Sequence, residues 1–239
     1  MTSLSVLRVF IGPDGRGGNP LGVVLDGAAV DPAERQAVAA RLGFSETVFV
    51  DSLTAGDDSA DDGVAPTIAT IRIFTPGAQL AFAGHPTVGT SWLLAAHGHP
   101  RVTLCPPAGD VLTWATDDGL RWIRARAAWV HPIDVQQLPS VAAVDAETPG
   151  ALGDPGRYVW AWEDETAGRL RSRYFPTELG IREDEATGAA AVVMGDRLAR
   201  ALTIRQGVGS EIHVRPDPAT GTVDVGGRVA LVEVRDLAG

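Results

Sequence analysis

Residues 82–90 read FAGHPTVGT and lead into an almost wholly apolar segment that ends near His97. Residues 183–189 read EDEATGA and lead into a second such segment, which ends near Ala201. Each stretch places an ionisable residue before a Thr and a Gly, and the two lie about half a chain apart. A helix that is apolar on most faces is usually buried. We therefore predict two strand-rich halves, each wrapped around one central helix, although chance similarity between two Ala- and Gly-rich helices explains the pattern equally well.

The rest of the chain is dominated by short runs of β-forming residues that Gly, Pro and Asp separate. The predicted strands are Val6–Ile11, Gly22–Leu25, Thr47–Val50, Ile68–Phe74, Val102–Leu104, Val111–Trp114, Arg121–Ala125, Tyr158–Trp162, Arg171–Phe175, Glu211–Pro216 and Val229–Val234. Helical patterns cover Thr87–His97, Gly188–Ala201 and Asp31–Leu42, the last with an Asp cap and a Pro at the first helical position. Together these elements predict an α+β fold.

Composition excludes several classes of protein. Twenty basic and thirty acidic residues among 239 give a net charge of −10, which argues against non-specific binding to nucleic acid or to an anionic membrane. No apolar run approaches the roughly 18 residues of a membrane span, and no secretory signal is recognisable, so we expect a cytoplasmic protein. Every basic residue is an arginine, which excludes a pyridoxal-phosphate aldimine. Cys105 is the only cysteine, which excludes a two-thiol racemase site.

Three ionisable side chains are candidates for proton transfer: His85 and Asp184 near the starts of the two apolar helices, and Glu46 between a helix end and an apolar strand. His85 titrates near neutrality, although a lone histidine in a Gly-His-Pro turn is more often structural. Glu46 lies among the apolar residues of the run 43–50. Burial there would raise its pKa and make it an acid or base near pH 7, unless it caps the strand or faces solvent. Asp184 suits a cleft-facing acid, the N-cap of the second helix, or both.

The N-termini of the two apolar helices would form an anion site if they face each other across a cleft. Their first backbone N–H groups lack intrahelical partners, and the positive ends of the helix dipoles reinforce them. Gly84 and Gly188 would let a ligand approach this backbone closely. The expected guest is a small carboxylate.

These motifs together resemble the phenazine-biosynthesis PhzF-like family. The matching stretches are GGNPLGVVLD, RQAVAARLGFSETVFV, RIFTPGAQLAFAGHPTVGT, CPPAGDV, EDEATGAAA and RQGVGSEIHV, in this order, between about Val6 and Val234. The family is similar to diaminopimelate epimerase in fold, with two similar halves that are each a curled, mostly antiparallel sheet around a central helix. The resemblance implies an active site in the cleft between halves at 1–115, which the C-terminal strand 226–239 would complete, and 116–225.

The resemblance also implies roles for single residues. Glu46, His85 and Asp184 fall on the family's catalytic positions. Its substrate-binding positions fall on Asn19, Ser45, Gly84, Gly188 and Ala189. This sequence departs from the family pattern at two places, because the family usually has serine where Ala189 stands and proline where Glu185 stands.

We therefore expect an isomerase of secondary-metabolite biosynthesis that works without cofactor or metal. It would move a proton on a small unsaturated or cyclic carboxylic acid by acid/base catalysis at Glu46. An amino-acid racemase or epimerase on the same fold is one alternative. A non-catalytic metabolite-binding or resistance protein is another, and the missing serine at Ala189 points that way. No nucleic-acid or membrane partner is expected, and the resemblance implies a homodimer.

Overall fold

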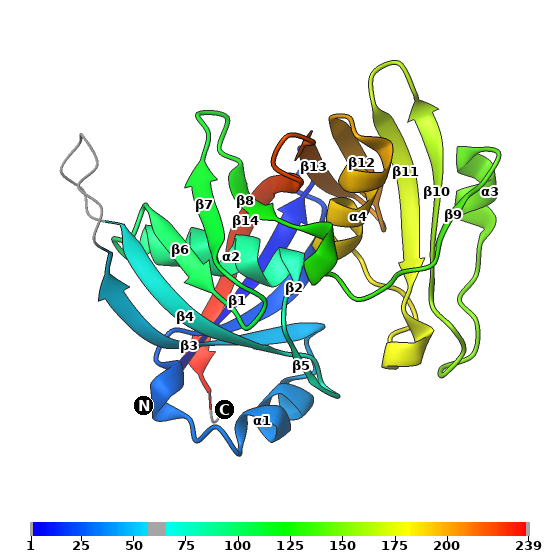
Figure 1. Ribbon diagram of the computed structural model, residues 1–239. Helices are drawn as coiled ribbons and strands as arrows, with labels where there is room; N and C mark the ends of the chain where they lie inside the picture. Colours follow the sequence, from blue (N-terminus) through cyan, green and yellow to red (C-terminus); the bar gives the residue numbers. More distant parts are fainter. Residues whose placement is uncertain (1, 57–65, 238–239) are drawn as a thin grey trace.

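The computed structural model describes residues 2–56 and 66–237 (Figure 1). Fourteen strands are assigned in this part of the chain. They are β1 (Ser3–Ile11), β2 (Gly17–Val24), β3 (Glu46–Ala55), β4 (Thr67–Phe74), β5 (Gln79–Leu80), β6 (Val102–Cys105), β7 (Val111–Ala115), β8 (Arg121–Ala125), β9 (Val135–Gln137), β10 (Arg157–Asp164), β11 (Arg169–Phe175), β12 (Leu202–Gln206), β13 (Ser210–Asp217) and β14 (Thr222–Asp236). The α-helices are α1 (Arg35–Leu42), α2 (Gly84–Ala96), α3 (Val141–Ala146) and α4 (Gly188–Leu198), and short 3-10 turns lie at Gly27–Ala29, Ala127–Trp129 and Thr177–Leu179. The prediction of a mixed α+β fold is therefore confirmed.

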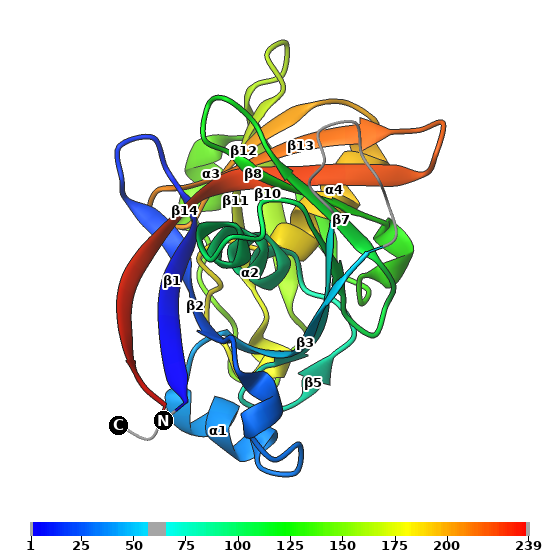
Figure 2. The same ribbon diagram turned by 90° about the vertical axis from the view of Figure 1, so that its left-hand side faces the viewer.

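The strands form one sheet in the order β1-β2-β3-β4-β6-β7-β8-β14-β13-β12-β11-β10-β9, with β5 beside β4. Most neighbours are antiparallel, and the parallel pairs are β2–β3, β4–β6, β9–β10 and β11–β12. Strand β14 also pairs with β1, so the path that runs from β1 to β8 and on to β14 returns to its start. Figure 2 shows helix α2 in the middle of this ring of strands.

Strand β14 takes part in two stretches of the sheet. Its first residues, Thr222–Gly227, pair with β8 and β13. Its later residues, Arg228–Asp236, pair with β1. The same strand thus joins the ring around α2 to the part of the sheet that contains β9–β13. The similarity of two halves, and their boundaries near residues 115 and 225, remain predictions.

The two apolar helices occupy the interior, as their composition predicts. Helix α2 contacts strands throughout the ring, and α4 packs against β13 and β14. Val88, Leu93 and Leu94 of α2 are at most 2% exposed, and burying side chains of this size stabilises a fold by roughly 1.5–3 kcal/mol each. Gly89 lies against β1 and β2, where a β-carbon would stand 2.5 Å from Leu21 and 2.7 Å from Val9. A larger residue there would force the side chains of Leu21 and Val9 to shift.

All eleven predicted strands are present, most of them longer than predicted. Strands β5, β9 and β12 and helix α3 were not predicted. The first predicted helix, Asp31–Leu42, begins only at Arg35, because Asp31 accepts a hydrogen bond from the Ala33 amide and holds a turn there (2.9 Å). The helix predicted to run to Ala201 ends at Leu198, since Ala199 has φ +50°. Among the described residues, no helix is both long enough and apolar enough to cross a membrane.

Candidate active site

The N-termini of α2 and α4 touch each other. A β-carbon on Gly84 would lie 2.5 Å from the carbonyl carbon of Gly188, and one on Gly188 would lie 2.8 Å from the His85 amide nitrogen. Only glycine fits at either position. In the described structure neither helix has a side-chain cap at its N-terminus. The two helix starts therefore bring uncapped N–H groups and two positive dipole ends to one place.

Glu46 and His85 face each other beside these helix starts. Glu46 is the first residue of β3, and His85 is the second residue of α2. Glu46 Oε2 lies 3.3 Å from His85 Nε2, and the two side chains are 15% and 4% exposed. Neither atom has a partner in hydrogen-bond geometry among the described residues. The two groups are therefore close together and mostly buried, and no other described side chain forms a hydrogen bond with either atom.

The backbone fixes the tautomer of His85. Its ring is hydrogen-bonded to the backbone of Pro20, which has only a carbonyl to offer, so a ring N–H must be the donor. Because Nε2 has no partner, the donor is Nδ1. Burial lowers the pKa of His85 to about 3, so the ring is neutral at physiological pH and the expectation that it titrates near neutrality was wrong. Nε2 then carries a lone pair and lies 3.3 Å from the Glu46 carboxyl group.

Asp184 lies in a hydrogen-bond network that includes residues far from it in the sequence. Asn19 Nδ2 donates to Asp184 Oδ1 at 2.7 Å and to the Ala186 carbonyl at 2.9 Å, and Ser45 Oγ donates to Asn19 Oδ1 at 3.0 Å. Thr187 Oγ1 donates to Asp184 Oδ2 at 2.5 Å. The N-cap of α4 is Thr187, so the interpretation of Asp184 as that cap was wrong. Its carboxylate is held by side chains instead of by the helix amides.

Both carboxyl groups are shifted toward neutrality. Burial raises the pKa of Asp184 to about 6, although the hydrogen bonds from Thr187 and Asn19 act in the opposite direction. Burial also raises the pKa of Glu46 well above its usual 4.5, and the nearby charge of Asp184 adds to this effect. The sequence-based prediction of a raised Glu46 pKa is confirmed. Carboxyl groups whose pKa is raised in this way can give a proton to a bound molecule, or take one from it, near neutral pH.

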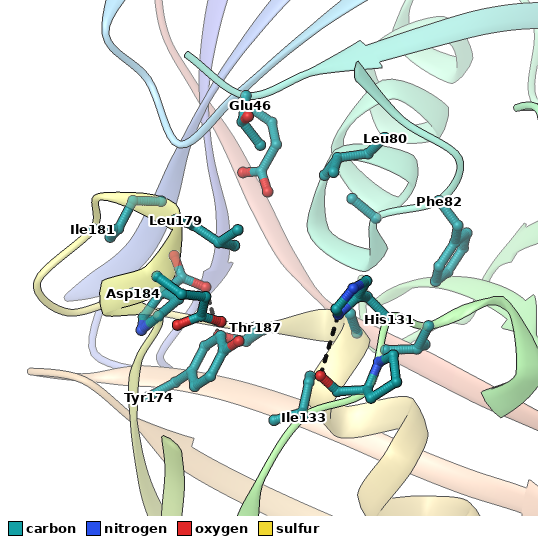
Figure 3. A pocket seen from close by; sticks show the side chains of 17 residues that line it. Glu46, Leu80, Phe82, His131, Ile133, Tyr174, Leu179, Ile181, Asp184 and Thr187 are labelled. Carbon is teal, nitrogen blue, oxygen red and sulfur yellow. Dashed lines mark hydrogen bonds between the residues drawn. The ribbon is translucent and has the colours of Figure 1, made fainter. Parts of the chain in front are cut away.

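A pocket of about 190 Å³ opens next to these two acids (Figure 3). It is lined by Glu46, Thr75, Leu80, Phe82, Ala83, Val130, His131, Pro132, Ile133, Tyr174, Pro176, Glu178, Leu179, Ile181, Asp184, Thr187 and Ala189. Figure 3 shows Glu46 on one side of the pocket, Asp184 and Tyr174 on another, and His131 on a third. The polar groups therefore gather around a mostly hydrocarbon space, which suits a small molecule with few polar atoms.

The structure brings most of the predicted site residues together. Glu46, Asp184 and Ala189 line the pocket. The other predicted residues do not line the pocket but lie next to residues that do. His85 contacts Glu46, Asn19 is bonded to Asp184, and Ser45 is bonded to Asn19. Gly84 and Gly188 contact each other at the helix starts. Sequence reasoning missed His131, Tyr174 and Thr187; of these only Thr187 lies in a quoted motif. No group of three or more potential metal ligands exists within residues 2–56 and 66–237.

Comparisons with known proteins place the chain among relatives of one family. Residues 12–123 match the model of a family described as phenazine biosynthesis-like protein, PhzC-PhzF. The chain is 30% identical to the trans-2,3-dihydro-3-hydroxyanthranilate isomerase of Pseudomonas fluorescens, over 82% of this chain and 79% of that protein. It is 40% identical to an uncharacterised isomerase of Pasteurella multocida, over 92% and 89% of the two chains. The crystal structure of a PhzF-family phenazine biosynthesis protein from Bacillus anthracis superposes with a TM-score of 0.74, at 20% identity, over 98% of each chain.

Proposed function

This chain belongs to the phenazine biosynthesis-like family, and on that premise we propose that it moves a proton between carbon atoms of a small unsaturated or cyclic carboxylic acid. Relatives that match most of its length are isomerases, and the chain is an isomerase of the same family. The proposal adds the substrate class and the proton carrier, which is Glu46. The observation that carries it is the position of Glu46 on the pocket wall with a raised pKa, 3.3 Å from an unprotonated imidazole nitrogen.

The proposed mechanism begins with the substrate carboxylate at the helix starts. The uncapped amides at the start of α4, where Ala189 lines the pocket, would bind this group and stabilise negative charge that shifts toward it when a carbon loses its proton. Ionised Glu46 takes the proton from that carbon. The protonated carboxyl group of Glu46 then donates a hydrogen bond to His85 Nε2. This hydrogen bond keeps the proton on Glu46 until Glu46 returns it to a different carbon.

The test is turnover in deuterium oxide with a panel of unsaturated, cyclic and aromatic carboxylic acids. A substrate should exchange one carbon-bound hydrogen and move a double bond. General acid–base residues contribute about 10²–10⁴-fold, so Glu46→Gln should lower kcat at least about 100-fold and change KM by no more than a few-fold. Glu178→Gln is the matched control, because Glu178 lines the same pocket without contacting His85 in the described structure. More than roughly a tenth of wild-type turnover in Glu46→Gln would exclude the glutamate as proton carrier.

A second candidate is epimerisation at one carbon, and a specific observation favours it. Asp184 lines the same pocket as Glu46, and its pKa is raised to about 6, so a second acid/base group is available there. Deuterium incorporation with inversion, and without movement of a double bond, would support this reaction. Tight binding of an acid with neither exchange nor conversion would instead support the non-catalytic binding protein, in which Ala189 in place of serine is the altered position.

A further inference from the structure

Glu185 follows Asp184 in the chain, but its side chain reaches away from the pocket lining toward the turn between β12 and β13. Its Oε1 accepts hydrogen bonds from the Val208 amide at 3.0 Å and from Ser210 Oγ at 2.8 Å. Its Oε2 lies 3.1 Å from the same Val208 amide. A β-carbon on Gly207 would collide with this carboxylate. Glu185 therefore holds the turn 207–210 against the segment that carries Asp184.

The same turn is also hydrogen-bonded to the start of β2. The Gly18 amide donates to Ser210 Oγ at 2.8 Å, across 192 positions of sequence. Backbone meets backbone here, because a β-carbon on Gly17 would collide with the Ser210 nitrogen. Ser210 thus accepts from Gly18 and donates to Glu185. The next residue after Gly18 is Asn19, whose amide group donates to Asp184.

Hydrogen bonds therefore link the adjacent residues 184–185 to the adjacent residues 18–19 of β2. Asp184 is bonded to Asn19 directly, and Glu185 is bonded to Gly18 through Ser210. We propose that Glu185 is a positioning residue, which fixes Asn19 through the Ser210 bridge and so keeps the Asp184 carboxylate at the pocket. This role rests on the proposed function, because it gives Asp184 a fixed place relative to Glu46 and the substrate. A displacement of about 1 Å in such a site can cost about 100-fold in rate.

The charge of Glu185 has a separate effect. Burial is the main reason that the pKa of Asp184 is raised, and the charges of Glu185 and Glu183 add to it. Glu183 is paired with Arg173 at 2.6 Å, and the charge of Asp184 in turn raises the pKa of Glu46. Positioning by the hydrogen bonds and repulsion by the charge are therefore two different consequences of one carboxylate, and substitutions can separate them.

Three variants make this separation. Glu185→Gln can keep both bonds made by Oε1 and loses only the charge and the longer Val208 contact. Ser210→Ala keeps the charge but removes the bridge to Gly18. Glu185→Ala removes both. Glu163→Ala serves as the matched control, because it removes a glutamate that pairs with Arg205, two residues before this turn, and leaves the bonds of Glu185 and Ser210 in place.

Two measurements need no substrate. Hydrogen exchange at the Gly18 amide should accelerate at least about tenfold in Ser210→Ala and Glu185→Ala, because the acceptor or its anchor is lost, and should stay unchanged in Glu185→Gln and Glu163→Ala. Carbon-13 NMR titration of the Asp184 carboxyl group should give a lower pKa in Glu185→Gln and Glu185→Ala than in the wild type. If Glu185→Ala fails to fold, the other two variants still give each result.

Kinetics then test the positioning role itself. With a verified substrate, kcat should fall about 10- to 100-fold in Ser210→Ala and stay within a few-fold of wild type in Glu185→Gln. Unchanged Gly18 exchange in Ser210→Ala, or faster exchange with unchanged kcat, would overturn the proposal. Faster exchange together with no proton transfer on any acid would leave the structural link standing and refute the proposed function instead.

Discussion

Replacing Asp184 by Asn should change how the free energy of unfolding depends on pH. The pKa of Asp184 is raised from 3.8 to about 6 in the folded protein, chiefly by burial. Folding therefore favours the protonated carboxyl group, so its contribution is complete below pH 3.8 and is lost as the pH rises through 6. Each pKa unit corresponds to about 1.4 kcal/mol, which gives a loss of about 3 kcal/mol between about pH 4 and 7.5. The side chain is only 9% exposed, so solvent screens this cost little.

The Asp184→Asn variant has no such ionisation and retains an oxygen that can accept from Asn19. Urea unfolding of both proteins at several pH values between about 4 and 8 measures the difference. The variant should gain about 3 kcal/mol relative to wild type on going from about pH 4 to pH 7.5, even though it loses activity. Asp217→Asn is the control, because the pKa of Asp217 is lowered and its variant should show no such gain. If the difference between the wild type and the Asp184→Asn variant stays constant within about 0.5 kcal/mol over this range, the reasoning is refuted.

Two further substitutions test other parts of the structure. Gly84→Ala should destabilise the protein by about 3 kcal/mol or more, because its β-carbon would stand 2.5 Å from Gly188, whereas Gly77→Ala, which meets nothing within 4 Å, should leave the thermal midpoint within about 2 °C. Ala189→Ser should add a hydroxyl group to the pocket wall and lower KM about two- to tenfold for acids with a second polar group, but not for purely hydrocarbon acids; steady-state kinetics with matched pairs of acids measures this.

The strands were predictable because each leaves a local pattern of β-forming residues between turn-forming ones. Strands of two or three residues, such as Gln79–Leu80 and Val135–Gln137, are too short to produce such a pattern. Strand Leu202–Gln206 was missed for a different reason. It begins three residues after Ala199, where the left-handed backbone ends the helix, and alanine gives no signal for that conformation.

The site was only partly predictable. Motifs at the starts of the two apolar helices pointed to His85 and Asp184, and the motif between a helix end and an apolar strand pointed to Glu46. Burial explains why the pKa of Glu46 shifts in the expected direction. The pocket walls from 130–133 and 174–181 come from segments without a motif, so only the folded chain places them there. Gln206 does lie in a quoted stretch, RQGVGSEIHV, but only the folded chain shows that its fully buried side-chain amide donates to the Asp184 carbonyl at 2.9 Å and to Thr187 Oγ1 at 2.8 Å.

The course of β14 limits how this enzyme can admit its substrate. Residues 223–226 of β14 are paired with a strand on each side, and the strand continues into its ladder with β1. A hinge between the two parts of the sheet would have to break this ladder, so wide domain opening is a costly route. Entry is easier past the loops that bear His131 and Leu179, which belong to no strand. The side chains on those segments should therefore discriminate between acids that differ in bulk.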